Sequence, residues 1–327
     1  MSILDDIRKR AVKCSKKIVL PESEDARTLD AINIILNKKM TKIILVGEES
    51  LSRKIKGKNL SGIEIINPTK YRDLEALISK YYELRKHKGI TIEEARDAVM
   101  NNFLIFGAML VRAGAADGFV AGANNTTADV IRCGLRCLEI DKNIGVVSGA
   151  FLMEVPDPDY GEKGVFVFSD CAVNVEPDAK QLAGIAVSAA GLFKQLVGPE
   201  PRVALLSYSS KGSAKGPLVE KVKEALKLAR TISPGILIDG ELQADSAIVP
   251  EVALKKSAAS EVAGRANVLI FPDLNSGNIG YKLIQRLANA RAIGPLLQGF
   301  TRPASDLSRG CSVDDIVDAA AIIAVRA

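Results

Sequence analysis

The segment SDLSRGCSVDDIV, residues 305–317, gathers the side chains of this chain that are best suited to chemistry. Ser308 and Arg309 stand before a glycine, and Asp314 and Asp315 stand directly before an apolar run. An arginine beside a helix N-terminus is suited to holding an anion. A serine hydroxyl can stabilise a developing oxyanion, and a carboxylate can accept a proton. The segment therefore predicts an anion-binding site with its own acid-base group.

Part of this segment also has a purely structural explanation, because it has the pattern of a helix start. Ser312 is a good N-cap, and the two acids fall in the first turn, where the helix dipole favours negative charge. Ser312 and Asp315 have the spacing of a capping box. Capping explains Asp315 but not Ser308 and Arg309, which precede the helix on a loop. The spacing does not decide whether Asp314 or Asp315 would act as a base.

The chain contains one histidine, His87, and five scattered cysteines. A single histidine excludes two-histidine metal sites, and a Ser-His-Asp triad would have to use His87, which lies among lysines. We therefore expect any general base to be a carboxylate. The odd number of widely spaced cysteines favours reduced thiols and a cytoplasmic location, and their spacing predicts no zinc site.

The composition is that of a globular protein of about two domains. The chain has 327 residues, of which 47% are hydrophobic and 25% are charged. Its net charge of +5 suits an anionic small molecule, and the acids mixed among the bases argue against nucleic acid. The basic stretch from Ile7 lacks the apolar region of a signal peptide. No apolar run reaches the roughly 18 residues that span a bilayer, so we expect no membrane partner.

Short apolar runs alternate with stretches of helical spacing, which predicts an α/β fold. Residues 144–177 predict two antiparallel strands joined by a turn rich in Pro, Gly and Asp, so the sheets are expected to be mixed but largely parallel. Ligands of such sheets bind beyond the strand C-termini. In the first half of the chain, strands are predicted within 17–23, 42–47, 62–68 and 118–125, and helices over 25–38, 71–89, 91–118 and 126–139.

Several polar loops follow predicted strands. The loop GANNTTAD, residues 122–129, opens a helix that carries Arg132. The loop LIDGELQADSAI carries Asp239, Glu241 and Asp245, which are ordinary strand-end acids or a possible metal pair. Residues 207–217 contain glycine and lysine but not in P-loop order, and no dinucleotide fingerprint is present. These residues favour an α/β enzyme acting on a phosphorylated anion, without naming its reaction.

Five longer motifs carry more specific information. They are ELRKHKGIT, LLSYSSKGSAKGP, LIDGELQADSAIVP, NVLIFPDLNSGNIGYK and DLSRGCSVDDIV. Together they resemble phosphate acetyltransferase (phosphotransacetylase), in the family's order and spacing and over essentially the whole chain. The likeness is to the short form of the family, without the additional N-terminal P-loop-type domain of the long form.

The resemblance implies the reaction acetyl-CoA + phosphate ⇌ CoA + acetyl phosphate. It implies two α/β domains of the isocitrate/isopropylmalate dehydrogenase-like fold, with the active site in the interdomain cleft, and a homodimer. We assign residues 1–143 and 293–327 to the first domain and 144–292 to the second, the expected dimerisation domain. CoA or acetyl-CoA is expected as co-substrate, with no tightly bound cofactor and no metal.

Residue roles follow from the matched motifs. The resemblance implies that Ser308, Arg309 and Asp315 are catalytic. It also implies that Arg85 and Arg132 act on the phosphate and CoA side, and that Arg27 is a further arginine near the CoA site. The matching substrate-lining segments contribute Asn124, Thr126, Thr127, Asn278, Tyr281 and Lys282.

The implied chemistry needs a base for the thiol of CoA. A free thiol has a pKa of about 8.5 and an ordinary aspartate about 3.9, so complete proton transfer beforehand would cost roughly 6 kcal/mol. Asp315 would therefore have to accept the proton as the sulfur attacks, or be buried in a closed cleft. A helix N-terminus and Arg309 both favour its ionised form, which makes it a weaker base. We predict direct attack without an acetyl-enzyme, because Ser308 has no obvious histidine or lysine base.

Three alternatives remain at this stage. The first is transfer of a longer acyl group such as butyryl. The second is a metal-dependent NAD(P) decarboxylating dehydrogenase of the same fold, supported only by Asp239, Glu241 and Asp245. The third is an inactive regulator that binds CoA or acetyl phosphate, against which the intact Ser308, Arg309 and Asp315 argue.

Overall fold

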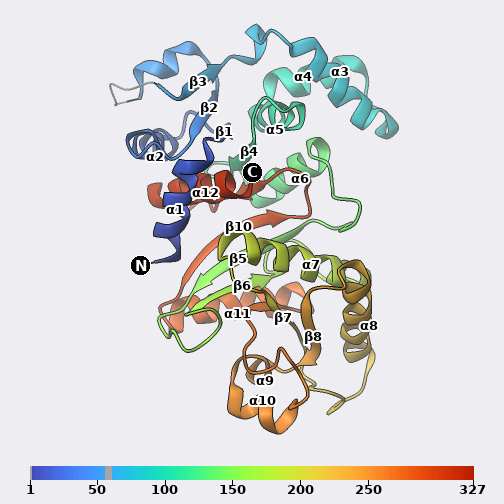
Figure 1. Cartoon of the computed structure of the whole chain (residues 1–327). Helices are drawn as coiled ribbons and strands as arrows, with labels where there is room; N and C mark the ends of the chain where they lie inside the picture. Colours follow the sequence, from blue (N-terminus) through green and yellow to red (C-terminus); the bar gives the residue numbers. More distant parts are fainter. Residues whose placement is uncertain (1, 56–60) are drawn as a thin grey trace. The chain divides into compact units, whose positions relative to one another are not determined.

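The computed structural model describes residues 2–55 and 61–327, and the chain forms two compact units (Figure 1). Unit 1 contains the residues up to Glu139 together with Phe300–Ala327, and unit 2 contains Ile140–Gly299. The sequence-based division at 143–144 and 292–293 places most of strand β10, Arg291–Gln298, outside the second domain. The structure assigns β10 to unit 2 because it pairs along its length with a unit 2 strand.

The sheet of unit 1 is parallel throughout its described pairings. Its strands read as almost continuous apolar runs, as expected when helices cover both faces of a sheet. In spatial order the strands are β3 (Ile63–Ile66), β2 (Lys42–Val46), β1 (Lys17–Leu20), β4 (Gly118–Ala121) and β11 (Ala304–Asp306).

Helix α12 (Val313–Arg326) is largely buried and follows directly on the segment that carries Ser308 and Arg309. Every residue from Ile316 to Ala324 is buried, because α12 packs against strands β1 and β4 and against two other helices, α1 and α2. The helices of unit 1 are α1 (Ile3–Cys14), α2 (Ala26–Asn37), α3 (Leu74–Arg85), α4 (Ile92–Asn101), α5 (Phe103–Ala113), α6 (Thr127–Cys137) and α12 (Val313–Arg326), with 3₁₀ turns at Glu49–Arg53, Pro68–Lys70 and Lys86–Lys88.

The single long helix predicted over 91–118 is wrong, because the structure has two helices there. Thr91 caps α4 with the predicted capping box to Glu94. Asn102 then has extended backbone angles, ends α4, and caps α5 by accepting a hydrogen bond from the Ile105 backbone. The break lets α5 turn and pack on β1 through Gly107, where an added Cβ would lie 2.8 Å from Val19. Asparagine is a preferred N-cap, so the signal was present inside an apolar run that obscured it.

The sheet of unit 2 is mixed, as the sequence predicts. The two strands on either side of the Pro/Gly/Asp turn are antiparallel, and β10 is antiparallel to β5. The remaining described pairings are parallel. In spatial order the strands are β10, β5 (Ser148–Glu154), β6 (Val165–Ser169), β9 (Val268–Ile270), β7 (Arg202–Leu206) and β8 (Leu237–Leu242).

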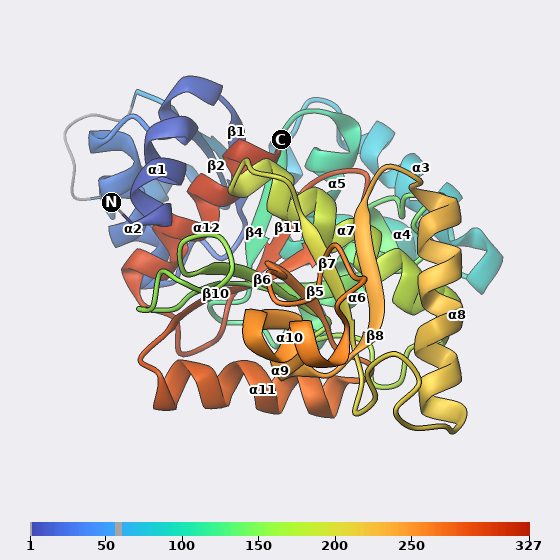
Figure 2. The same ribbon diagram turned by 60° about the horizontal axis from the view of Figure 1, so that its bottom comes forward.

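Helix α11 of unit 2 is apolar on two sides. Its inner side places Tyr281 and Ile284 against a core of phenylalanines from β5 and β6. Its outer side carries Ile279, Leu283 and Leu287, which are 57%, 52% and 81% exposed. Figure 2 shows α11 at the margin of unit 2 with no other element beyond it. The helices of unit 2 are α7 (Ala179–Leu196), α8 (Pro217–Ile232), α9 (Ala244–Ile248), α10 (Pro250–Lys256) and α11 (Leu274–Leu287).

Across both units, none of the described helices has the length and apolar character required to cross a membrane.

Candidate active site

Three loops of unit 1 meet at the carboxyl ends of adjacent parallel strands. Strand β11 pairs with β4, and β4 pairs with β1, so the loops that follow these strands leave the same edge of the sheet. These loops span residues 21–25, 122–126 and 307–312. This is the edge where α/β sheets bind ligands, and it carries most of the residues predicted from the sequence.

Glu22 holds the loop after β4 in place. This carboxylate is 9% exposed and accepts hydrogen bonds from the backbone N–H groups of Gly122, Ala123, Asn124 and Asn125, at 2.7–2.9 Å. The Asn125 side-chain amide donates a fifth hydrogen bond at 2.7 Å. Four consecutive backbone donors are thereby directed at one buried acid, so the loop 122–125 has little freedom to move.

Arg27 joins the loop after β4 to the loop after β11. Its Nη1 donates to the carbonyls of Arg309 (2.7 Å) and Cys311 (3.0 Å), and its Nη2 donates to the carbonyl of Ala123 (2.7 Å). Its Nε and Nη2 also donate to the Asp25 carboxylate. These contacts use all five donors of a guanidinium group. Arg27 therefore acts here as a brace between loops and has no N–H group left for a substrate phosphate.

The side chains of Ser308 and Arg309 lie at the surface of this braced loop. Both residues are exposed, and the Ser308 hydroxyl accepts a hydrogen bond from the Gly310 backbone. Arg309 forms no ion pair with any described residue, although its own carbonyl is held by Arg27. A guanidinium on a fixed backbone without an internal partner is suited to binding an external anion.

Asp315 is exposed and completes the predicted capping box of α12. Its Oδ2 accepts hydrogen bonds from the Ser312 backbone (2.8 Å) and hydroxyl (2.9 Å), and its own N–H donates to the Ser312 hydroxyl. The capping explanation is thus confirmed. Within unit 1 the side chain does not have the burial that would strengthen it as a base. Cys311, the thiol of the same segment, is buried, and this burial raises its pKa although Arg27 opposes the rise.

The start of α6 carries a second group of predicted residues. Thr126 caps the helix by accepting from the Asp129 backbone, and Asp129 forms an ion pair with Arg132 at 2.7 Å. The side chain of Arg132 is 54% exposed. Arg85 is the last residue of α3, which packs against α6, and it forms no ion pair with the described residues. Arg85 and Arg132 are therefore both cations of unit 1 that reach solvent near the same helix.

Asp306 is a buried acid at the end of β11 that the sequence analysis did not single out. It is 1% exposed, and its Oδ2 accepts a hydrogen bond of 2.6 Å from the Thr127 hydroxyl. Gly122 has a φ of +116°, and a Cβ added there would lie 2.4 Å from Asp306 Oδ1. A glycine is therefore required at this point of the loop. Burial raises the pKa of Asp306 to about 7.

Comparison with known proteins gives this arrangement a context. The sequence profile of the family described as "Phosphate acetyl/butaryl transferase" matches residues 2–324. The chain belongs to this family. It is 50% identical over 328 residues to a phosphate acetyltransferase of Thermoanaerobacterium thermosaccharolyticum, covering 100% of both chains.

Solved structures agree with this membership. The chain is 41% identical to a phosphotransacetylase from Streptococcus pyogenes, with a TM-score of 0.93 and coverage of 100% of this chain and 99% of that one. A branched-chain phosphotransacylase from Enterococcus faecalis has a TM-score of 0.65 at 18% identity, covering 95% and 99%, which supports the fold alone. The α/β class with mixed, largely parallel strands and the family predicted from the motifs are both confirmed.

The structure places the remaining predicted residues in two groups. Asn124 is exposed on the loop held by Glu22. Asn278, Tyr281 and Lys282 lie on α11 in unit 2. There the Asn278 amide donates to the Cys171 carbonyl, and the Tyr281 ring stacks on Phe151 at 4.1 Å. Lys282 is exposed, with its ammonium 5.8 Å from the Tyr281 ring centre. These three residues therefore have structural contacts within unit 2, and their substrate roles stay a prediction.

The glycine- and lysine-containing loop 207–217 of unit 2, which follows β7, is fixed by two acids of strand β8, Asp239 and Glu241. Glu241 accepts hydrogen bonds from the Ser209 hydroxyl (2.9 Å) and the Gly212 backbone (2.8 Å). Lys211 donates to Asp239 at 2.5 Å. Asp245 pairs with Lys256 at 2.8 Å. Each of the three acids that suggested a metal pair thus has its own donors, and the described residues include no group of three or more His, Cys, Asp or Glu arranged to hold a metal ion.

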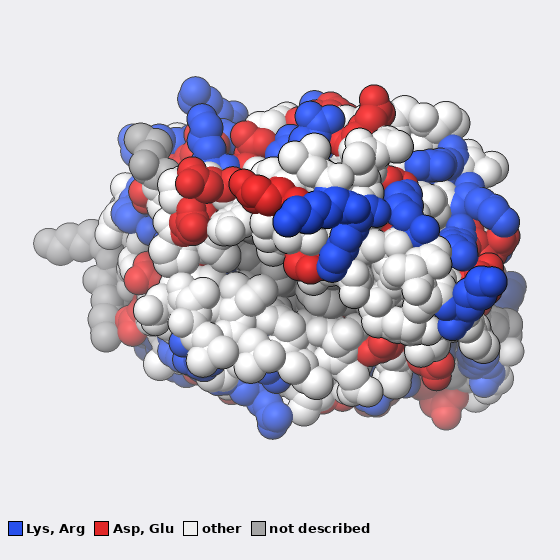
Figure 3. Space-filling model, turned by 90° about the horizontal axis from the view of Figure 1, so that it is seen from below, with Lys and Arg blue, Asp and Glu red and all other residues white. Residues whose placement is uncertain are grey.

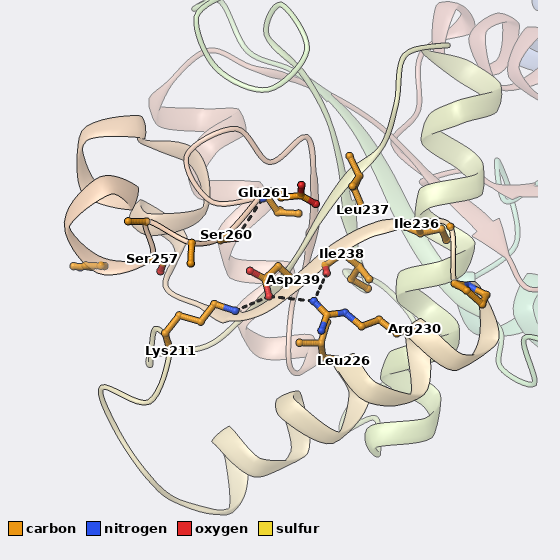
Figure 4. A pocket seen from close by; sticks show the side chains of 16 residues that line it. Lys211, Leu226, Arg230, Ile236, Leu237, Ile238, Asp239, Ser257, Ser260 and Glu261 are labelled. Carbon is orange, nitrogen blue, oxygen red and sulfur yellow. Dashed lines mark hydrogen bonds and ion pairs between the residues drawn. The ribbon is translucent and has the colours of Figure 1, made fainter.

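A surface cavity of about 960 Å³ lies beside this loop (Figure 4). Lys211 and Arg230 both point at Asp239 from opposite sides, and Arg230 also donates to the Ile238 carbonyl. A third cation of the cavity lining, Lys256, pairs with Asp245, so each of these cations is directed at an acid of the same unit. None of the residues predicted to bind substrate lines this cavity.

Three residues of the unit 1 site escaped the sequence analysis: Glu22, Asp25 and Asp306. Glu22 and Asp25 come shortly after the apolar strand β1, and this position was the available signal; Asp306 ends β11, whose sequence Ala-Ser-Asp gives no such signal. The partner of Asp25, Arg27, is only two residues away, but nothing in the local sequence indicates that Glu22 and Asp306 are paired with the backbone of residues 122–125 and with Thr127, which lie on other segments.

Proposed function

We propose that this chain catalyses the reversible transfer of an acetyl group between CoA and inorganic phosphate, acetyl-CoA + phosphate = CoA + acetyl phosphate. The observation that carries the proposal is the exposed guanidinium of Arg309, which forms no ion pair with the described residues. Arg27 and the N-cap of α12 hold the loop that carries it. The chain also belongs to the phosphate acetyl/butaryl transferase family. A fixed cation of this kind suits the phosphoryl group of the substrate.

The reaction proceeds by direct attack of the CoA sulfur on the acetyl carbonyl while both substrates are bound. Arg309 neutralises charge on the phosphoryl oxygens or on the carbonyl oxygen, and the Ser308 hydroxyl donates a hydrogen bond to the latter. Arg85 and Arg132 are further binding groups for phosphate and CoA, and Asp315 is the acid-base group implied by the motif. CoA is a co-substrate, and the reaction uses no tightly bound cofactor.

Phosphate-dependent release of CoA from acetyl-CoA, followed with a thiol reagent, tests this proposal. We expect turnover that requires phosphate and produces acetyl phosphate in equal amount. Absence of turnover with purified, folded protein would favour the alternative of an inactive CoA-binding regulator. Labelled acetyl phosphate offered without CoA should leave no acetyl group on the protein, and a stoichiometric burst of acetyl-protein would contradict direct attack.

The acyl-chain range needs a separate measurement, because the family description includes butyryl transfer. We expect kcat/KM to fall from acetyl phosphate to propionyl phosphate to butyryl phosphate. The opposite order would replace the acetyl proposal with the longer-chain alternative. The dehydrogenase alternative is tested in the same assay by adding EDTA and omitting nicotinamide, and full activity under both conditions would dismiss it.

The outer side of α11 supports a homodimer formed through unit 2. Ile279, Leu283 and Leu287 recur every four residues on this side, and Val175, which is 71% exposed, precedes the helix and accepts a hydrogen bond from the Leu274 backbone. An apolar stripe of this kind is self-complementary across a twofold axis. Figure 3 shows a broad area without charged side chains, with both basic and acidic side chains around it. Sedimentation analysis should give twice the chain mass.

The cytoplasm is the proposed location. All five cysteines are free, as expected in a reducing compartment.

A further inference from the structure

The carboxylate of Asp306 is buried, and only one of its two oxygens has a side-chain hydrogen-bond partner. Its Oδ1 is buried and has no hydrogen-bond partner among the described residues, whereas its Oδ2 accepts from the Thr127 hydroxyl. A buried carboxylate with one oxygen unsatisfied is costly, and structures retain such a group where it has a functional use. The residue lies at the end of β11, immediately before the loop that carries Ser308 and Arg309.

The charges around Asp306 favour its protonated form. Electrostatic repulsion from Glu22, on the loop after β1, acts on it, and none of the cations in the described part of the chain is paired with it. Arg326 on α12 donates to the Ala304 carbonyl on the same strand, and β4 contributes the apolar Ala121 beside it. Burial, assisted by the charge of Glu22, raises the pKa of Asp306 to about 7, although hydrogen bonds from Thr127 and the Leu307 backbone oppose the rise.

Thr127 connects this buried acid with the surface of the site. It is the first residue of α6, it is partly exposed, and its hydroxyl points inward to Asp306. A hydroxyl that donates to one group can accept from another at the same time. Thr127 can therefore pass a proton inward by giving its own proton to Asp306 while it receives one from a bound substrate.

We propose that Asp306 accepts, through the hydroxyl of Thr127, the proton that the CoA thiol loses as its sulfur attacks acetyl phosphate. The S–H proton moves to Thr127 Oγ1 and the Thr127 hydroxyl proton moves to Asp306 Oδ2. The sulfur forms a bond to the acetyl carbon, and the carbon–oxygen bond to phosphate breaks with its electron pair leaving on the phosphate. Asp306 then returns its proton to phosphate or solvent by the same route, and in the reverse direction it protonates the departing thiolate.

This inference rests on the proposed function and assigns the proton of the CoA thiol to Asp306 in place of Asp315, the residue implied by the motif. Asp315 is exposed and serves as a helix cap, whereas Asp306 is buried, and burial raises its pKa to about 7, nearer to the thiol pKa of about 8.5 than that of an ordinary aspartate. A base works best when its pKa lies near the operating pH. Asp306 is a positioning and proton-holding group that acts through Thr127, so its role must be tested by pH dependence and not by loss of activity alone.

The test measures kcat/KM for CoA in acetyl-CoA synthesis from pH 6 to pH 9. In the wild type it should rise with pH and level off above about 7, because the relay needs ionised Asp306. Asp306→Asn keeps the shape and the Thr127 hydrogen bond but cannot take a proton. At pH 7 we expect it to be about a hundredfold slower, the usual size of a general-base contribution. Its deficit should shrink at least about tenfold by pH 9, where the thiol ionises without help.

Thr127 variants provide an independent arm of the experiment. Thr127→Val should show the same pH-dependent deficit as Asp306→Asn, and Thr127→Ser, which keeps the hydroxyl, should restore most of the activity. The pH dependence of the Thr127 variants still tests the relay if Asp306→Asn fails to fold. A deficit that is constant from pH 6 to pH 9, or wild-type rates in Asp306→Asn at pH 7, would overturn the relay. Failure of the proposed function would differ from either result, because the wild type itself would then not turn over.

Discussion

In unit 1 the loop after β11 carries Arg309 without an ion pair to the described residues, whereas in unit 2 the loop after β7 directs Lys211 onto Asp239 at 2.5 Å. Both loops are rich in Ser, Gly and basic residues, and both are held by buried acids. They differ in how they are held: Arg27 and Asp25 hold the unit 1 loop by its backbone, while Asp239 takes the basic side chain itself. A cation is available to a substrate only where the backbone, and not the side chain, is anchored.

The same two units differ in how they treat helices of equal length. α12 and α11 each have 14 residues, but α12 has the more apolar sequence and buries every residue from Ile316 to Ala324, whereas α11 buries only Gly277. α12 is enclosed by β1, β4, α1 and α2, while the outer side of α11 has no described neighbour beyond it. Unit 1 thus buries its apolar helix next to the site, and unit 2 leaves one apolar side of its helix exposed, which is the side we propose for the dimer contact.

The largest expected effect tests the free cation of unit 1. Arg309→Ala should lower kcat/KM for phosphate-dependent CoA release by at least about a hundredfold, as removal of one preorganised charge-stabilising donor does. The matched control is Arg72→Ala, which removes a 91%-exposed arginine of the same unit. We expect that variant to stay close to wild type. Equal losses of kcat/KM in the two variants would show that Arg309 has no specific role in binding the substrate anion.

The brace formed by Arg27 should affect both stability and activity. Arg27→Met keeps the aliphatic stem and removes five donors from Asp25 and three carbonyls. We expect the free energy of unfolding to fall by about 2 kcal/mol, the value of hydrogen bonds made by a charged group, and kcat to fall with it. Chemical denaturation and steady-state kinetics measure the two effects. An unchanged stability together with a higher KM for CoA would instead assign Arg27 to direct substrate binding.

Substitution on the exposed side of α11 should separate assembly from catalysis. Leu283→Lys places a charge within the apolar stripe and should raise the dimer dissociation constant about tenfold, which corresponds to about 1.4 kcal/mol. Val12→Lys, at a 45%-exposed apolar residue on α1, is the control and should leave the dimer intact. Analytical ultracentrifugation over a concentration series distinguishes them. If Val12→Lys dissociated the protein and Leu283→Lys did not, the interface would have to be moved to unit 1.

The smallest effect is expected in the charged loop of unit 2. Burial opposes ionisation of Asp239, but the hydrogen bonds from Lys211 and its neighbours leave the pKa lowered. The lowered pKa means that ionised Asp239 stabilises the folded chain. This stabilisation is fully present above the pKa of an unfolded-state aspartate, about 4, and is lost as the pH falls below it. Lys211→Met should therefore cost less than about 1 kcal/mol at pH 7, since this lysine is partly exposed and Arg230 stays near the acid. The cost should shrink as the pH falls below about 4 and Asp239 becomes protonated.

Activity of Lys211→Met completes that comparison. We expect kcat/KM within twofold of wild type, since Lys211 is occupied by Asp239. A loss as large as that of Arg309→Ala would show that the basic loop of unit 2 also serves the reaction.

Much of this protein can be predicted from its sequence because the signals are local. Alternation of strands and helices, the Thr91 and Ser312 capping boxes and the antiparallel pair in residues 144–177 depend on neighbouring residues, and the structure confirms each of them. The family could be named because whole motifs are contiguous. The break at Asn102 was missed because an apolar run outweighed one capping residue.

Tertiary structure alone decided which polar residues work together. Arg27 appears from the sequence to be a binding residue, and only the folded chain shows its donors used by carbonyls of residues 123, 309 and 311. Glu22 and Asp306 are unremarkable acids until strand pairing brings them beneath loops from distant parts of the chain. Burial and hydrogen-bond partners set the charge of a carboxyl, and these depend on contacts between residues far apart in the sequence, which a linear pattern does not contain.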